Sequence, residues 1–357
     1  MNKFLLKIFA FGFPILLLQV FTLLFYSPDK GDLLRIGYIL DEYPDYREKF
    51  ADDFRKPLKV ISVDQITTEE KYDLLTIGDS FLEQGNSGFQ NFLALEHLVK
   101  VVHIGKNLHK NQFRKLMELT ESDFFDQFKF DYVLLEFIEA GSHGVTKSLN
   151  STYPFSKESF SKRTANAKQD FTKRLVFPSD RIIKFPYYTV KRALYPNAGC
   201  NQVYAVNLME NPFSVPDSTL FFHASNLERI NNNDREDIKQ LNSKLNQLAK
   251  GLEVKGVKLI VMPVPDKLDY YFELVQDPGR LQKTEFFQII QGMERDYKLI
   301  NTLEVLKTNS GDQKDVFYFD DTHWSPVGAK IIADRIAEEL FERESIRKAR
   351  IQASNLE

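Results

Sequence analysis

Two short segments of this 357-residue chain carry residue types that nucleophilic catalysis requires. The first is Gly78-Asp79-Ser80, which follows directly on the apolar run Tyr72–Ile77. Ligands of open α/β sheets bind beyond the carboxyl ends of the strands, so a serine at this place is a candidate nucleophile. A Gly-Asp-Ser tripeptide also occurs by chance in roughly one such chain in ten. A turn and helix N-cap is therefore the alternative interpretation.

The second segment, Asp321–Trp324, lies near the end of the chain and contains its one tryptophan. A histidine two residues after a carboxylate fits a general base that an acid holds in one tautomer. The pattern Asp-x-His-Trp is expected by chance in on the order of one such chain in a hundred. Ser325 and Pro326 suit the N-cap and first position of a helix, which predicts a loop just before it. No further His or Cys cluster supports a metal pair, so neither metal nor cofactor is predicted.

The elements that must position these segments are short apolar runs that alternate with amphipathic stretches. Runs typical of buried parallel strands are Tyr72–Ile77, Val99–Ile104, Tyr132–Ile138, Lys258–Val264 and Leu299–Ile300. Apolar residues at helical spacing occur in Leu93–Leu98, Asn111–Leu119, Leu227–Leu252 and Val327–Leu340. This alternation predicts an α/β fold built on a doubly wound parallel sheet with flanking helices.

The alternation stops between residues 141 and 220, where Ser, Thr, Asn, Lys, Pro and Tyr dominate. We interpret this stretch as an insertion in a domain that spans residues 31–357, serving as a lid or substrate platform. A loop without regular structure is the alternative. The mixed, charged stretch Asp29–Glu70 contains no motif, and it is interpreted as a tether and entry to the domain.

Residues 1–30 predict a membrane anchor. No charged residue occurs from Ile8 to Pro28, and this length crosses a hydrocarbon core of about 30 Å as a helix. The basic residues before the run place the amino end in the cytoplasm and the following chain outside it. A cleaved signal peptide is the alternative, although Leu24-Phe25-Tyr26 offers no small-residue cleavage site.

The bulk composition excludes several classes of protein. With 43% hydrophobic and 27% charged residues, the chain can bury a large core. A net charge of −3 leaves no basic face for nucleic acid, so no nucleic-acid partner is predicted. Cys200 is the one cysteine, so the chain forms no internal disulfide and no thiolate metal cage.

Together, the two catalytic segments resemble the SGNH superfamily, in which the Gly-Asp-Ser serine lies near the start of the domain and Asp and His near its end. The Asp-Thr-His-Trp block, the Ser-Pro-x-Gly-Ala after it and the block Pro263–Lys267 with Tyr270 are similar to one branch more narrowly. That branch is the alginate acetyltransferases and their relatives, which O-acetylate bacterial exopolysaccharides outside the cytoplasmic membrane. The resemblance covers residues 72–139 and 227–340.

Two features depart from these families. In the alginate enzymes the Asp-Thr-His-Trp block precedes Gly-Asp-Ser, whereas here it follows. Hydrolytic SGNH members also have an asparagine after the third strand that donates to the oxyanion, and this chain has Glu139 there. An ionised glutamate cannot donate a hydrogen bond. The oxyanion hole is therefore predicted from the backbone amides of Ser80 and Gly105, with His143 as a further candidate.

The resemblance implies a catalytic triad in which Ser80 attacks, His323 takes its proton and Asp321 orients the imidazole. It predicts a membrane-anchored, extracytoplasmic serine acyltransferase of the bacterial cytoplasmic membrane that O-acetylates a cell-surface or exported polysaccharide. A multi-spanning membrane acyltransferase is implied as the partner that delivers the acyl group. An esterase or deacetylase with the same triad, or a non-catalytic carbohydrate-binding assembly subunit, remains an alternative.

Three further residues are candidates for binding the substrate: Lys267, Tyr270 and Trp324. Lys267 and Tyr270 follow the predicted strand Lys258–Val264, where an anionic or sugar ligand would lie. A solvated lysine and packing aromatic residues are the alternative interpretation.

Overall fold

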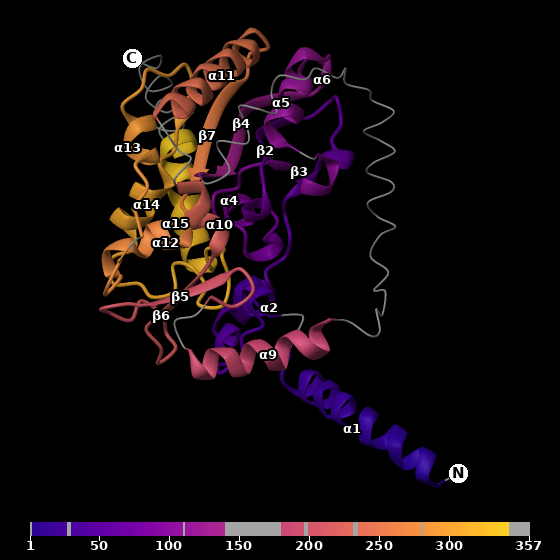
Figure 1. The fold of residues 1–357 in the computed structure, drawn as a ribbon. Coiled ribbons are helices and arrows are strands. Elements are labelled where there is room, and N and C mark those ends of the chain that lie inside the picture. Colours follow the sequence, from indigo (N-terminus) through magenta and orange to yellow (C-terminus); the bar gives the residue numbers. More distant parts are fainter. Residues whose placement is uncertain are drawn as a thin grey trace, which may run out of the picture.

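The computed structural model describes residues 2–26, 30–109, 111–139, 180–195, 199–230, 235–279 and 281–342. Its centre is a six-stranded parallel sheet in the order β1-β3-β2-β4-β7-β8 (Figure 1). The strands are β1 Ile61–Ser62, β2 Lys71–Ile77, β3 Val101–Ile104, β4 Lys129–Ile138, β7 Lys258–Val264 and β8 Lys298–Leu299. From β2 the chain first adds β3 on one side and then β4 on the other, so the strand order reverses at β2. The predicted α/β fold with a parallel sheet is confirmed.

Helices cover both faces of the sheet. One face packs against α4 Phe89–Glu96, α14 Thr302–Asn309 and α15 Pro326–Ala337, and the other against α5 Gln112–Glu121, α6 Phe124–Gln127, α11 Arg235–Val254 and α13 Phe286–Gln291. Consecutive strand residues alternate between the two cores, so Leu74 joins the first and Leu75 the second. Burial on both sides explains why the strands are continuously apolar.

Most predicted elements appear within a few residues of their expected bounds. The stretch expected as a helix at Leu93–Leu98 begins at Phe89 and ends at Glu96 instead. Leu98 is 83% exposed and has a φ of 56°, a left-handed conformation that cannot continue a helix. The stretch Leu227–Leu252 contains the end of α10 Ala224–Ile230 and most of α11, and residues 231–234 lie outside the described ones.

The predicted insertion is described only in part, because residues 140–179, including His143, lie outside the described ones. The rest contains α9 Arg181–Leu194 and an antiparallel pair, β5 Val203–Asn207 and β6 Thr219–His223. Val203, Leu208 and Phe213 of this stretch are buried in the same core as the face of the sheet that carries Leu74. The described part of the stretch is therefore built into the main core.

The segment after the N-terminal helix is also part of the core, so its interpretation as a tether is wrong. It forms α2 Asp32–Gly37, the 3-10 turn η1 Tyr46–Phe50 and α3 Ala51–Phe54. Leu33 and Phe50 are 0% and 3% exposed. Its apolar residues are spaced irregularly among charged ones, so no helical or strand period revealed them.

The N-terminal helix α1 spans Asn2–Phe25, and its stretch Lys7–Phe25 is long and apolar enough to cross a membrane. It is the one such helix among the described residues, and it lies almost wholly outside the core. A signal sequence would have the same length and composition.

The burial of η1 predicts that this segment stabilises the domain. We expect Phe50→Ala to lower the free energy of unfolding by about 3–5 kcal/mol, because it leaves a cavity in a packed core. Phe54, four residues on and 36% exposed, is the matched control and should cost much less. Urea unfolding of the detergent-solubilised full chain measures both, and equal losses would contradict the assignment of the segment to the core.

Candidate active site

Ser80 lies at the carboxyl end of β2 and begins the 3-10 turn η3 Ser80–Leu82. Gly78 is required here because a Cβ atom would collide with the carboxylate of Glu136 on β4. The carboxylate of Asp79 accepts the N–H of Ile138 at 2.9 Å. The turn that presents Ser80 is thus fixed against the neighbouring strand.

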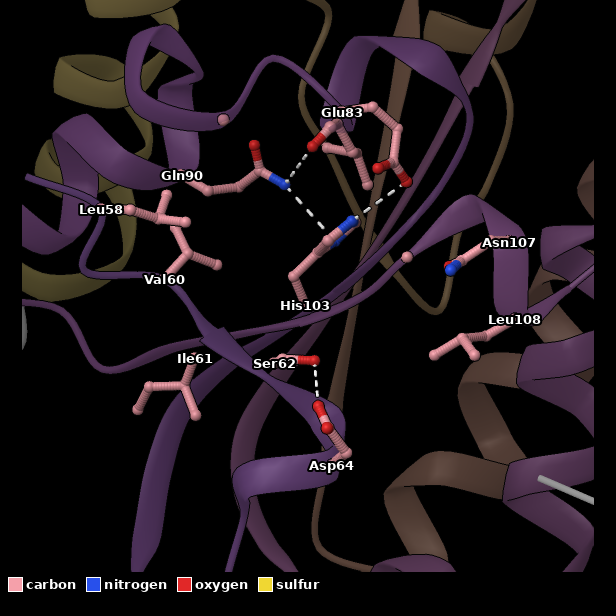
Figure 2. Close-up of a pocket in the computed structure, with 13 residues that line it drawn as sticks. Leu58, Val60, Ile61, Ser62, Asp64, Glu83, Gln90, His103, Asn107 and Leu108 are labelled. Carbon is pink, nitrogen blue, oxygen red and sulfur yellow. Dashed lines mark hydrogen bonds and ion pairs between the residues drawn. The ribbon is translucent and has the colours of Figure 1, made fainter. Parts of the chain in front are cut away.

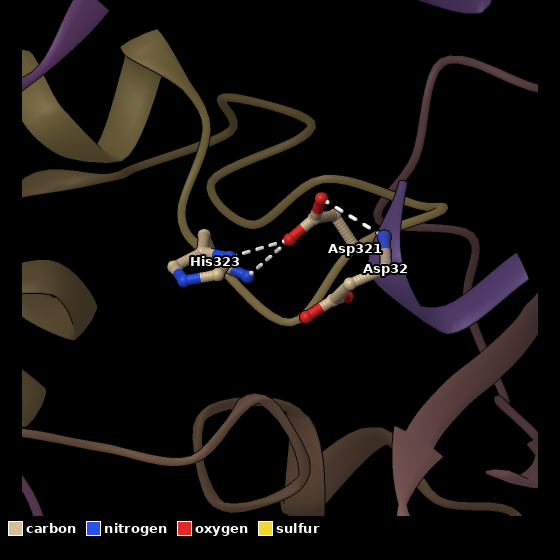
Figure 3. Close-up of side chains that lie close together, drawn as sticks. All are labelled: Asp32, Asp321 and His323. Carbon is tan, nitrogen blue, oxygen red and sulfur yellow. Dashed lines mark hydrogen bonds and ion pairs between the residues drawn. The ribbon is translucent and has the colours of Figure 1, made fainter. Parts of the chain in front are cut away.

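His323 and Asp321 lie on the loop that joins the bridge partners Phe317 and Trp324. His323 Nδ1 lies 2.6 Å from Asp321 Oδ1, and the same oxygen accepts the His323 N–H at 3.1 Å (Figure 3). His323 Nε2 is buried and has no hydrogen-bond partner among the described residues. The acid therefore holds one ring nitrogen and leaves the other for proton transfer. Ser325 caps α15 through the Val327 N–H, as predicted.

The charges around this pair set its protonation. Burial alone would lower the pKa of His323, but the hydrogen bond and charge of Asp321, joined by Asp32 and Asp79, raise it above its ordinary value. Burial would raise the pKa of Asp321, but His323 and Arg47 hold it well below its ordinary value. Asp321 thus stays ionised at neutral pH, and His323 is made a stronger base.

The turn that carries Ser80 contacts the His323 loop. The rings of Phe81 and His323 are 4.7 Å apart, and Gln84 Nε2 donates to the Trp324 carbonyl at 2.7 Å. Among the described residues, no hydrogen bond joins Ser80 to His323. Catalytic hydrogen bonds are often long without substrate and tighten in the complex. Both segments meet where the strand order reverses, the usual ligand site of such sheets.

Sequence reasoning missed Asp32, which lies beside the pair (Figure 3). Its N–H donates to Asp321 Oδ2 at 3.1 Å, and its carboxylate accepts the N–H of Thr322 at 2.8 Å and the hydroxyl at 2.5 Å. Burial and the charge of Asp321 raise the pKa of Asp32. Asp32 and Asp321 are 289 residues apart, so no local pattern could link them.

Arg47 was missed for the same reason. Its guanidinium lies 2.9 Å from Asp320 and 3.0 Å from Asp321, and it stacks 4.2 Å from the ring centre of Tyr318. The backbone at position 31 also lies against the backbone of Asp320. A Cβ atom there would collide with Asp320, so this contact requires Gly31. The adjacent acids Asp320 and Asp321 were the one sequence signal that a buried cation must lie nearby.

The ligand atoms of Asp32, Asp321 and His323 lie within 4.8 Å of one another, which raises the question of a metal. Asp321 Oδ1 already binds the imidazole, and both carboxylate oxygens of Asp32 accept hydrogen bonds from Thr322. A metal ion would compete with these bonds for the same oxygen atoms. The arrangement fits a hydrogen-bonded catalytic group better than a metal centre.

The predicted substrate contacts of Lys267 and Trp324 are not supported, because the two side chains are 1% and 0% exposed. Lys267 Nζ donates to the Phe319 carbonyl at 2.8 Å, and burial lowers its pKa to about 7. Tyr270 is half-buried, and its hydroxyl donates to Ser310. Lys267 thus supports the loop that carries Asp321 and His323, a role that motif spacing cannot distinguish from ligand contact.

The oxyanion hole remains a prediction, and the structure places its members. The pairing of Ile77 with Ile104 puts Gly105 at the same edge of the sheet as Ser80. Glu139 is 1% exposed, and burial with the charge of Asp269 raises its pKa well above the ordinary value, which works against the ionised form assumed for it. It accepts the N–H of Asp266 at 3.1 Å, away from the turn of Ser80.

A pocket of about 440 Å³ opens beside Gly105 at the carboxyl ends of β1 and β3 (Figure 2). Figure 2 shows Glu83 and Gln90 directed toward His103, and His103 Nε2 lies 3.3 Å from Glu83 Oε1. Leu58, Val60 and Ile61 lie on one side of the pocket, and Leu108 lies on the other side beside Asn107 (Figure 2). Polar groups on the other side include Asn107.

The parallel sheet, the serine after β2 and the acid–histidine pair before α15 are arranged as the SGNH resemblance predicts. Residues 217–357 match the model of the family described as "SGNH hydrolase-like domain, acetyltransferase AlgX". This confirms the predicted resemblance for that part of the chain, which contains Asp321 and His323 and leaves Ser80 outside. No curated protein matches the chain.

The charge of Asp32 predicts a pH dependence. The raised pKa of His323 implies that its titration midpoint lies above the ordinary value of about 6.5. Asp32→Asn keeps an acceptor for Thr322 but removes a negative charge, so the midpoint should fall. NMR titration of the His323 ring measures it directly, and the acidic limb of the pH–rate profile should move in the same direction. The fully exposed Asp52 supplies the control Asp52→Asn; equal midpoints in all three proteins would exclude the coupling.

Proposed function

We propose that this chain is a membrane-anchored serine acyltransferase that O-acetylates a polysaccharide outside the cytoplasmic membrane. The observation that carries the proposal is the orientation of His323. Its Nδ1 is held by an ionised acid, and its unpartnered Nε2 lies on the loop that contacts the turn of Ser80. The match of the surrounding segment to an acetyltransferase family supports acyl transfer as the chemistry.

In the proposed reaction, His323 Nε2 takes the proton of the Ser80 hydroxyl as Ser80 Oγ attacks the carbonyl carbon of the acyl donor. The N–H groups of Ser80 and Gly105 stabilise the oxyanion, at about 3 kcal/mol for each donor. Collapse breaks the bond to the leaving group, which receives the proton from His323. A sugar hydroxyl then gives its proton to His323, attacks acetyl-Ser80 and releases the serine, which regains the proton.

The pocket beside Gly105 is the proposed binding site for the acceptor sugar. Its volume of about 440 Å³ falls within the usual range of small-ligand sites. The carboxylate of Glu83 and the side chain of Asn107 offer hydrogen-bond partners for sugar hydroxyls. Glu83 follows Ser80 by three residues, which brings this pocket close to the nucleophile.

The location of the site fits a donor that is delivered at the membrane. Asp32 contacts Asp321, and it is only the seventh residue after the end of α1 at Phe25, a span of at most about 25 Å. If α1 crosses the membrane with its amino end in the cytoplasm, the catalytic loop lies close to the outer membrane surface. A multi-spanning acyltransferase in the same membrane could then supply the acyl group to Ser80.

We expect Ser80→Ala and His323→Ala to lower acyl transfer by on the order of 10⁴-fold or more, because the members of a triad act as one unit. A fluorophosphonate probe should label the wild type at Ser80 and fail to label Ser80→Ala. Ser122→Ala is the control for an ordinary serine. Undiminished labelling of Ser80→Ala would remove Ser80 as the nucleophile, and the non-catalytic alternative would gain if the wild type were not labelled.

We also expect transfer to outrun hydrolysis. Glu139 stands where hydrolytic relatives have an oxyanion donor, and the loss of one donor slows attack on acetyl-Ser80 by roughly 10²- to 10³-fold, whether water or a sugar attacks. A sugar held in the pocket offsets this loss, because it presents its hydroxyl at high effective molarity, whereas water does not. Acetylated oligosaccharide and free acetate are measured together, with an activated acetyl ester as donor.

The variant Asn107→Ala tests the pocket in the same assay. It should raise the KM for the oligosaccharide and leave acetate release unchanged, because the Asn107 side chain belongs neither to the triad nor to the proposed oxyanion donors. Rapid acetate release that no oligosaccharide alters, with no acetylated sugar across several acceptors, would favour the esterase alternative.

A further inference from the structure

The outer face of α9 is apolar and exposed. Ile183, Tyr187, Val190 and Leu194 are 69%, 59%, 59% and 67% exposed. Their spacing of four, three and four residues places them on one stripe of the helix. A contiguous exposed stripe of this kind on a folded domain indicates a surface that another phase or molecule covers.

The opposite face of α9 fixes the direction of this stripe. Phe185 is 0% exposed, and its ring lies 5.6 Å from that of Phe21 and 5.4 Å from that of Tyr26, at the end of α1. Tyr188 stacks on Tyr38 at 5.8 Å. Figure 1 shows α9 across the end of the domain from which α1 departs. The stripe therefore faces away from the domain, beside the last turns of the apolar helix.

All charged residues within α9 are basic. Its sequence RIIKFPYYTVKRAL contains four basic residues and no acidic one. Lys184 and Lys191 flank the stripe; Lys184 pairs with Asp180 at the start of the helix, and Lys191 Nζ donates to the Gly199 carbonyl. Arg181 lies 5.5 Å from the ring centre of Tyr26. Basic and aromatic residues beside an apolar face are typical of helices that lie at a membrane surface with anionic lipids.

We propose that α9 is an interfacial helix that lies in the outer headgroup region of the membrane that α1 spans. Its stripe Ile183–Leu194 enters the lipid, and its lysines face the headgroups. A helix of a partner protein would cover the same stripe, but the excess of basic residues on α9 and the contact with the end of α1 favour lipid. The inference rests on the anchoring role proposed for α1. Because α1 and α9 would both attach the domain to the membrane, they would fix its orientation as well as its distance from the membrane surface.

The test uses the full chain in vesicles of phosphatidylcholine and phosphatidylglycerol. An environment-sensitive thiol label is placed at α9 with Val190→Cys, in α1 with Phe13→Cys and at the end of α11 with Val254→Cys. Val254 is 86% exposed and serves as the matched aqueous control. The native Cys200 is buried and should not react. Lipid-borne nitroxide should quench positions 13 and 190, the latter at a depth of about 5–10 Å from the surface, and aqueous iodide should quench position 254.

The outcomes separate the two proposals. Lipid quenching at position 13 with iodide quenching at position 190 equal to that at 254 overturns the interfacial helix and leaves the anchor standing. Protection of position 190 from both quenchers also overturns it, because a protein surface would then cover α9. Loss of lipid quenching at position 13 overturns the anchor itself. A second variant, Leu194→Asp, should reduce lipid quenching at position 190 severalfold, whereas Leu58→Asp, at a site that is also exposed, should not.

Discussion

The buried charge of Asp321 is the constraint on which the site depends, because a carboxylate taken out of water must be matched by cations and hydrogen bonds. His323 meets one of its oxygens, and Arg47 and the N–H of Asp32 meet the other. The same contacts hold Asp321 ionised, and only an ionised acid can orient the imidazole and raise its pKa. Fold stability and catalytic readiness therefore rest on the same bonds.

These bonds join parts of the chain that are distant in sequence. Gly31 and Arg47 contact the loop of Asp321 from the N-terminal segment. Lys267, which is buried, contacts the same loop through a hydrogen bond to the Phe319 carbonyl. The turn of Ser80 reaches the loop from the carboxyl end of β2. Each part is placed by the core rather than by its neighbours in the chain, so the site forms only when the whole domain folds.

This dependence explains which features the sequence could predict. The buried strands, the Gly-Asp-Ser turn and the Ser325 cap follow from local spacing, and local spacing is visible in one chain. Asp32 and Arg47 act across more than 270 residues, so nothing around them revealed their role. Lys267 shows the opposite error, because a substrate contact was predicted for a residue that is buried. Its position after a strand is typical of a ligand site, but its burial follows from packing that no motif records.

The contacts of Asp32 also connect the proposed anchor to the chemistry. An anchor joined to a domain by a long flexible linker would leave the active site free to face any direction. Here Asp32, the seventh residue after the end of α1, already contacts the loop that carries Asp321. Helix α9 packs against the same end of α1. Such a short connection is a poor arrangement for an esterase that searches solution for substrate. It suits an enzyme that receives an acyl group at the membrane and passes it to a polymer emerging beside it, because donor and acceptor then approach a site whose orientation is already set.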